Sequence, residues 1–171
     1  MRARTRLLRL PFTVLLLAAA SLTVTGCFGR YAFIGLGTAI DILPAGYVSV
    51  TVGATPYYYH RGTFYRPYRR GYVVVAAPLG ALITVPPPGY VMVMVEDDPY
   101  HYHRGVFYAP RGGRYAVVRP PIGAFIRSVP DRAVTHTIDG VEYKEYAGAY
   151  YRPAIQNGRR GYQVTEPPQR R

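Results

Sequence analysis

Apolar and polar residues alternate along short stretches of this chain, with a period of two residues. In residues 47–52, three valines alternate with Tyr47, Ser49 and Thr51, the pattern of a strand with one buried face. Similar stretches follow, and two-residue turns such as Arg61-Gly62 separate them. The predicted strands of this unit are residues 48–52, 55–60, 63–66 and 72–76. No stretch after residue 27 keeps an apolar period of 3.6 residues over three turns, so we expect an all-β fold.

The same unit occurs again 43 residues later in the chain. Residues 44–85 align with 87–128 without a gap, and 22 of the 42 aligned pairs are identical. A third, more divergent copy runs from Pro130, and its Tyr162 comes four residues late, which predicts an insertion around Asn157-Gly158. A single meander of this size is marginally stable in water, so the copies are expected to pack on one another. We therefore predict three tandem repeats of about 43 residues, each a short antiparallel β-meander.

The turns determine which side chains share a face of each meander, because the loop length sets the register. Val50 is expected opposite Tyr57 across the first hairpin, and Tyr58 opposite Tyr65 across the second. The predicted core face holds Val48, Val50, Val52, Tyr57, Tyr59 and Phe64. The opposite face is our candidate interaction face, with partly exposed side chains: Tyr58, His60 and Tyr65 in the first repeat, and His101, His103 and Tyr108 in the second.

The third repeat keeps the aromatic and cationic character of this candidate interaction face. Lys144, Tyr146 and Tyr151 stand at the three corresponding positions. On the core face of the same repeat, His136 and Glu145 replace a valine and a tyrosine of the second repeat. These two side chains are placed to pair, which predicts that the core face of the third repeat is wetter than the others.

The first 26 residues have the pattern of an export signal. Four arginines within the first nine residues precede an apolar stretch from Leu10 to Ala20. That stretch is too short to span a bilayer, which needs about 20 apolar residues. A buried core helix is hard to combine with four arginines so close together. We therefore expect residues 1–26 to be a signal peptide.

The end of this segment resembles the lipobox of bacterial lipoproteins. It reads Val24-Thr25-Gly26-Cys27, with Val24 in place of the usual leucine, and Cys27 is the only cysteine. The resemblance implies that lipid is attached to the Cys27 sulfur, with cleavage after Gly26; an ordinary signal peptidase site is the alternative. Phe28 lacks the aspartate that retains many such lipoproteins at the inner membrane. The expected location is the bacterial cell envelope, with the outer membrane and its periplasmic side favoured.

The predicted organisation follows from these segments: a signal peptide (1–26), the lipidated Cys27 with a tether (27–36), two β repeats (37–79 and 80–122) and a divergent third repeat (123–168). The tandem P-Y-x-Y-H-R-G-x-F-Y unit behind a lipobox resembles uncharacterised families of bacterial envelope lipoproteins with tyrosine-rich repeats. That resemblance covers roughly residues 37–153. It implies an envelope location and β structure, and it implies no activity.

The mature chain is basic. Removal of residues 1–26 takes away four of the 21 basic residues and none of the nine acidic ones, which leaves a formal charge of +8. Arginines cluster in the predicted loops, and the candidate contacts to an anionic polymer are Arg69, Arg70, Arg111 and Arg114. They form either ordinary exposed ion pairs with acidic turns or a basic rim for an anionic envelope polymer. Export argues against nucleic acid as a partner.

Patterns of catalytic residues are sparse. The mature chain has two serines, and it contains no nucleotide-binding glycine loop and no H-E-x-x-H sequence. His101 and His103 share one face of a strand, as part of a metal site would, but the first repeat has Tyr58 in place of His101. We therefore predict no enzyme activity, no cofactor, no metal and no small-molecule substrate. The predicted function is a structural or protein-interaction module; the alternative is a glycan- or peptidoglycan-binding module that uses tyrosine faces and arginine loops.

Overall fold

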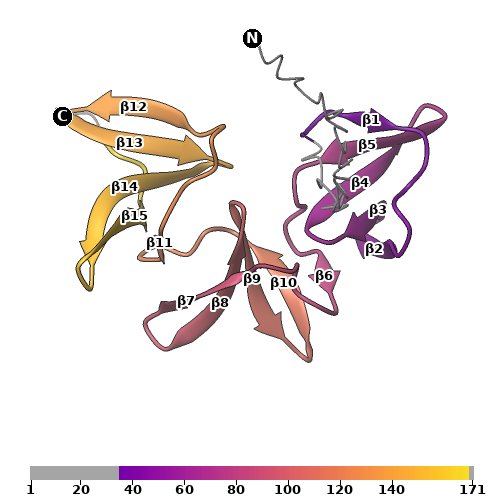
Figure 1. Cartoon of the computed structure of the whole chain (residues 1–171), viewed down its shortest axis with the longest axis horizontal. Coiled ribbons are helices and arrows are strands. Elements are labelled where there is room, and N and C mark those ends of the chain that lie inside the picture. Colours follow the sequence, from indigo (N-terminus) through magenta and orange to yellow (C-terminus); the bar gives the residue numbers. More distant parts are fainter. Residues whose placement is uncertain (1–34, 170–171) are drawn as a thin grey trace, which may run out of the picture. The chain divides into compact units, whose positions relative to one another are not determined.

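The structure, a computed structural model, describes residues 35–169, and these form strands, turns and loops without a helix (Figure 1). Fifteen strands make three antiparallel sheets of five strands each. The all-β prediction and its three tandem meanders are thereby confirmed. The signal peptide, Cys27 and residues 28–34 of the tether lie outside the described residues. Between residues 35 and 169, no helix is long and apolar enough to cross a membrane.

Each sheet is built from five consecutive strands. The first sheet contains β1 (Ala39–Ile40), β2 (Val48–Val52), β3 (Thr55–His60), β4 (Thr63–Tyr68) and β5 (Gly71–Val75). The second contains β6 (Leu82–Ile83), β7 (Val91–Val95), β8 (Asp98–His103), β9 (Val106–Arg111) and β10 (Arg114–Val118). The third contains β11 (Phe125–Ile126), β12 (Val134–Ile138), β13 (Val141–Tyr146), β14 (Ala149–Gln156) and β15 (Arg159–Thr165). The strand order of the first sheet is β1-β5-β4-β3-β2, and the other two sheets repeat it.

The pairing register agrees with the register expected from the turns. Val50 lies opposite Tyr57, and Tyr58 lies opposite Tyr65. The hairpin turns are tight, and Arg61 adopts a positive φ of 47° in its two-residue turn. Turns with positive φ match the right-handed twist of the flanking strands, which explains why loop length predicted the register correctly.

A fifth, two-residue strand in each repeat was not predicted. It pairs with the last strand of the meander, as β6 does with β10. Just before β6, the backbone N–H of Gly80 donates to the carbonyl of Val117 at 2.8 Å. Gly37 and Gly123 make the equivalent bonds to Val74 and Val164. Two residues carry too little of an alternating pattern for the sequence to reveal a strand.

The insertion in the third repeat lengthens one hairpin. β14 and β15 are each two residues longer than β9 and β10, and the turn lies at Asn157-Gly158, as predicted. Because each strand gains two residues, side chains keep their faces. Pro153 therefore pairs with Tyr162 in the third sheet as Pro67 pairs with Tyr72 in the first.

Two hydrophobic cores lie between neighbouring sheets, and each contains residues of both sheets. We call the side of Val50, Tyr59 and Phe64, with its equivalents in the other sheets, the front face; the side of Tyr58 and Tyr65 is the back face. The front face of the first sheet packs on the back face of the second through Val50, Tyr59, Phe64, Ala81, Ile83, Tyr108 and Val117. The front face of the second packs on the back face of the third through Val93, Phe107, Ala124, Ile126, Tyr151 and Val164. The predicted core face of the first repeat is therefore a core face, and its partner is the back face of the next repeat. Val48 is the exception, because it is 45% exposed.

The exposure predicted for the back face is wrong. Tyr65 packs with Leu43 and Val74 of its own repeat. Tyr65, His101 and Tyr108 are only 2%, 6% and 0% exposed. Tyr108 is covered because the front face of the preceding repeat lies on it. The remaining candidate residues of this face, Tyr58, His60 and His103, are half-buried. The alternating pattern revealed two faces with large side chains, but it could not show that both are covered.

Candidate functional site

Rings gather on the back face of the first sheet. Tyr58 lies between Tyr47 and Tyr72, with ring centroids 5.4 and 5.2 Å away and both contacts edge-to-face. Such contacts hold aromatic side chains in fixed orientations. In the third sheet Lys144 takes the place of Tyr58, and its Nζ lies 6.0 Å from the centroid of Tyr162. We call this arrangement the ring cluster of each sheet.

The ring cluster of the second sheet has His101 at its centre. The imidazole lies between Tyr90 and Tyr115, with ring centroids 4.4 and 4.8 Å away. Its Nδ1 is buried and has no hydrogen-bond partner among the described residues. Burial lowers the pKa of His101, because the charged form loses its hydration. The imidazole is therefore neutral near pH 7 and carries one unprotonated ring nitrogen.

His103 contributes to the contact between the first and second repeats. A Cβ added to Gly62 would lie 3.1 Å from both His103 and Pro87, so this glycine turn is pressed against the next repeat. Gly105 meets Tyr146 and Pro130 of the third repeat in the same way. Burial also lowers the pKa of His103. The predicted His101–His103 pair does share a face, but His103 packs against the neighbouring repeat.

Large tyrosines of the back face are packing residues. The hydroxyls of Tyr108 and Tyr151 are buried and have no hydrogen-bond partner among residues 35–169. Burial raises the pKa of both groups far above the usual value for tyrosine. On the opposing front faces, burial raises the pKa of Tyr59 and of Tyr102 to about 12. These four phenols therefore stay neutral at any physiological pH.

The front face of the third sheet is the wetter face that the sequence predicted. His136 Nε2 and Glu145 Oε2 lie 2.8 Å apart, and both side chains are 36% exposed. Tyr143 and Tyr150 on this sheet are also half-exposed. In the described chain no further sheet covers this face. An apolar residue at either position of the pair would leave a bare hydrophobic surface, which the ion pair avoids.

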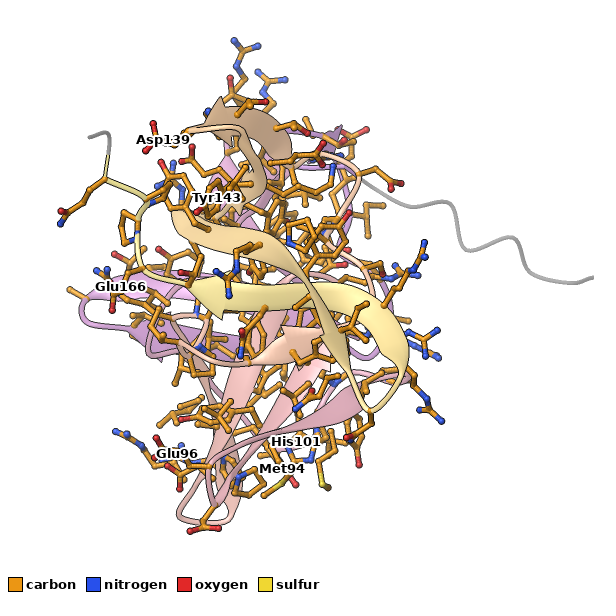
Figure 2. The ribbon with its side chains drawn as sticks, turned by 90° about the vertical axis from the view of Figure 1, so that its left-hand side faces the viewer. Met94, Glu96, His101, Asp139, Tyr143 and Glu166 are labelled. Carbon is orange, nitrogen blue, oxygen red and sulfur yellow. The ribbon has the colours of Figure 1, made fainter. Side chains whose placement is uncertain are left out.

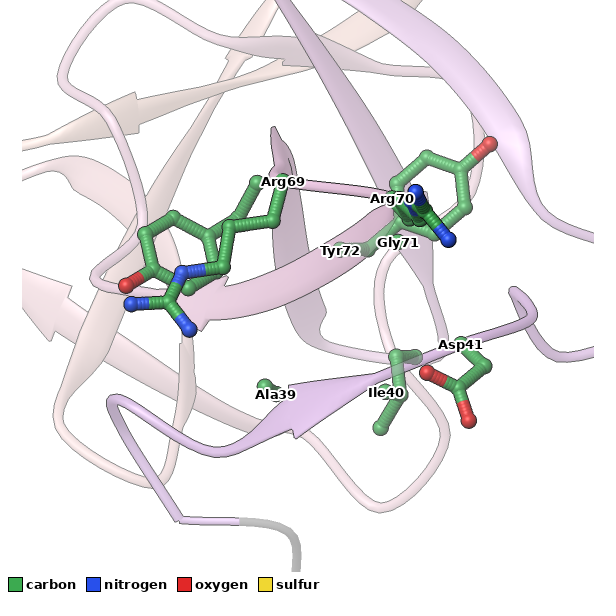
Figure 3. Close-up of a pocket in the computed structure, with 8 residues that line it drawn as sticks. Ala39, Ile40, Asp41, Arg69, Arg70, Gly71 and Tyr72 are labelled. Carbon is green, nitrogen blue, oxygen red and sulfur yellow. The ribbon is translucent and has the colours of Figure 1, made fainter.

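The predicted arginines all lie on the surface. Arg69, Arg70, Arg111 and Arg114 are exposed. The first two line a hollow of about 380 Å³ beside the short strand β1, with Asp41 and Tyr72 at its other walls (Figure 3). The guanidinium of Arg69 stacks over Tyr68, 5.2 Å from the ring centroid.

A second hollow occupies the same place in the third repeat. It measures about 710 Å³, and Arg127 and Arg160 line it. Sequence reasoning missed Arg127, because a single arginine after a two-residue strand belongs to no cluster. Ion pairs join His136 to Glu145 and Lys144 to Glu142. Neither pair involves one of the four predicted arginines, so these two pairs give no support to the ion-pair interpretation of the arginine loops.

Aliphatic side chains are exposed at the same two positions of every repeat. One position precedes the short first strand, and the other begins the edge strand β2, β7 or β12. The first carries Leu36, Leu79 and Ile122, which are 49%, 50% and 49% exposed. The second carries Val48, Val91 and Val134, which are 45%, 58% and 57% exposed. We call these six residues the exposed aliphatic series. The 43-residue offset could have revealed them, but only the structure shows that they stay uncovered.

No group of three His, Cys, Asp or Glu residues close enough to hold a metal ion occurs within the part of the chain that the structure describes.

The comparisons with known proteins give one match. Residues 25–167 match a family described as a family of unknown function (DUF6515). The match extends from just before Cys27 to just beyond β15, so it covers all three sheets. No curated protein and no solved structure matches the chain.

Proposed function

The chain belongs to this family of unknown function, and we propose that it is a non-catalytic structural or protein-interaction module of the bacterial cell envelope. The proposal includes a lipid on Cys27 that holds the three-repeat body at the membrane. A lipobox-like sequence and the only cysteine support this anchor. Two acyl chains make a stable anchor where a single one gives marginal binding.

The exposed aliphatic series is the observation that carries the protein-interaction role. A packing role would bury such side chains, yet all six are about half-exposed in three diverged copies of the repeat. Edge strands also present unpaired backbone N–H and C=O groups, which an extended segment of a partner can pair with. The candidate interaction surface therefore lies at the two edges of the sheets, and not on the back face that the sequence pattern favoured.

Site-specific photo-crosslinking in cells tests this role. A photoreactive residue at Val91 or Leu79 should give discrete protein adducts, because both side chains lie on the proposed contact surface. Thr51 is exposed on an edge strand but belongs to no aliphatic position, so it is the matched control. Equal labelling at all three sites, or none at Val91 and Leu79, would contradict the proposal.

A glycan- or peptidoglycan-binding module is the second candidate. Its support is the pair of arginine-lined hollows next to Tyr72 and Tyr162. Retention on purified cell-wall polymer should then fall with added salt and fall again in an Arg69→Gln/Arg70→Gln variant. Retention that changes neither with salt nor in the variant would show that these arginines do not bind the polymer.

Cell fractionation tests the anchor. The Cys27→Ala variant should leave the membrane fraction and change its migration. A variant that stays membrane-bound with unchanged migration would show that Cys27 is not lipidated.

A further inference from the structure

Two methionines stand at an unusual place on the second sheet. Met92 and Met94 lie on the edge strand β7, on the back face, and are 58% and 53% exposed. The chain has only one other methionine, Met1. At these two positions the first repeat carries Ser49 and Thr51, and the third repeat likewise carries hydroxyl side chains. The fold of the repeat therefore does not need thioethers here.

The methionines lie next to His101. Met92 pairs with His101 across β7 and β8, and Met94 follows two residues along the same face. Figure 2 shows Met94 and His101 on the second sheet. Directly opposed side chains on such a face have Cβ atoms about 4.5–5.5 Å apart, and methionine is long and flexible. The register therefore places two thioethers and one imidazole at neighbouring positions on one face of the sheet.

His101 is also unlike its counterparts. Tyr58 and Lys144 stand at the same position of the other repeats, so the imidazole is found only where the methionines are. It is 94% buried between Tyr90 and Tyr115, and its Nδ1 has no protein partner among the described residues. A buried ring nitrogen without a protein partner is open to a ligand. At these three positions the second repeat therefore differs from both other repeats, and it carries three soft or borderline metal ligands on one face.

We propose that Met92, Met94 and His101 form a binding site for a soft monovalent cation, Cu(I) or its analogue Ag(I). Thioether sulfur selects Cu(I), whereas Zn²⁺ prefers thiolate, imidazole and carboxylate, and Ca²⁺ and Mg²⁺ need oxygen ligands. The rings of Tyr90 and Tyr115 flank the imidazole and limit the access of water. The exposed methionines form the open side of the site, through which the ion enters. This site is independent of the proposed interaction role.

A Cu(I) competition titration tests the site. The full chain is purified in non-ionic detergent, and every sample carries Cys27→Ala so that no thiol competes. Cu(I) is presented by a chromophoric chelator, and the chain should remove one Cu(I) per molecule. A Met92→Ser/Met94→Thr variant, which carries the residues of the first repeat, should bind more weakly by at least about tenfold, the smallest loss typical of disrupting even the outer shell of a metal site. His101→Tyr, which copies Tyr58, should do the same.

His103→Tyr is the matched control, because Tyr146 stands at that position in the third repeat. It should keep the Cu(I) affinity of the parent chain. X-ray absorption of the Cu(I)-loaded parent should show sulfur and nitrogen neighbours, a result that does not depend on any variant folding. Unchanged affinity in the double methionine variant would overturn the proposal. So would a change in the sedimentation of the metal-free chain without any change in Cu(I) affinity, since the methionines would then serve contact between chains.

Discussion

A single added methyl group can test how the repeats pack. Gly62, Gly105 and Gly148 occupy the same turn position of the three repeats, all with positive φ, at 95°, 89° and 75°. A Cβ at Gly105 would lie 2.8 Å from Pro130 and also collide with the ring of Tyr146. At Gly148 nothing lies within 4 Å. The two glycines therefore differ mainly in whether another repeat covers them.

The expected losses of stability follow from these two environments. Both Gly105→Ala and Gly148→Ala place an L-residue in the left-handed region, which costs about 1–2 kcal/mol. Gly105→Ala adds overpacking against a rigid proline and an aromatic ring, which costs a further 1–3 kcal/mol or so, about the usual range for a core. The free energy of unfolding should thus fall by about 1–2 kcal/mol for Gly148→Ala and about 2–5 kcal/mol for Gly105→Ala.

Urea unfolding followed by tyrosine fluorescence measures this difference. The slope of the transition should stay the same in both variants, so that the shift in midpoint reports stability alone. The loss of stability in Gly62→Ala should lie between the losses in the other two variants. The closest contacts of the added Cβ would be at 3.1 Å, and a small movement of His103 relieves them. Equal losses for Gly105→Ala and Gly148→Ala would refute the packing of the second repeat on the third.

Three further predictions concern the buried phenols and the terminal ion pair. Tyr108→Phe should change the free energy of unfolding by less than about 1 kcal/mol, because the hydroxyl has no partner among the described residues. Tyr108→Ser should lower it by about 3–5 kcal/mol, because the buried ring is lost. Thermal unfolding measures both variants, and equal losses would contradict the burial of the ring. The pKa of Tyr59 is raised from 10.0 to about 12, so its neutral form stabilises the fold below pH 10, and that stability, roughly 2–3 kcal/mol, is lost as the pH rises from 10 to 12. Tyr59→Phe should flatten this alkaline loss in unfolding titrations; an unchanged pH profile would mean that the phenol is accessible. Glu145→Gln should lower the free energy of unfolding by at most about 1 kcal/mol, since both side chains of its pair with His136 are 36% exposed. A double-mutant cycle with His136→Ala measures the coupling energy of the pair, and a larger value would show that the pair is buried.

Local patterns predicted the strands of each meander and their register. A two-residue turn determines which residues of its two strands lie opposite each other. The pairs Val50–Tyr57 and Tyr58–Tyr65 could therefore be derived from spacing alone. The same logic placed His136 beside Glu145, because residues on neighbouring strands and the same face must be close. The 43-residue offset then carried each assignment from one copy to the next.

The site was less predictable, because exposure depends on contacts between distant parts of the chain. Tyr65 and Tyr108 were expected on a free surface, and both are buried. Val48 was expected in the core, and it is 45% exposed at the start of the edge strand β2, whereas Val50 on the same strand is 7% exposed. Strand order and the stacking of sheets are non-local properties, so no window of alternating residues contains them.

The sequence by itself determined the class of fold, the number of repeats, the register of their hairpins and the substitution of polar for apolar residues on the last front face. All of these follow from backbone geometry and turn chemistry, which act over a few residues. Only the tertiary structure decided that the front faces of the first and second sheets are covered by the back face of the next repeat. The physical reason is that a sheet with large side chains on both sides must bury both, and the partner of each face is chosen by packing across some 40 residues of chain, which local preference does not specify.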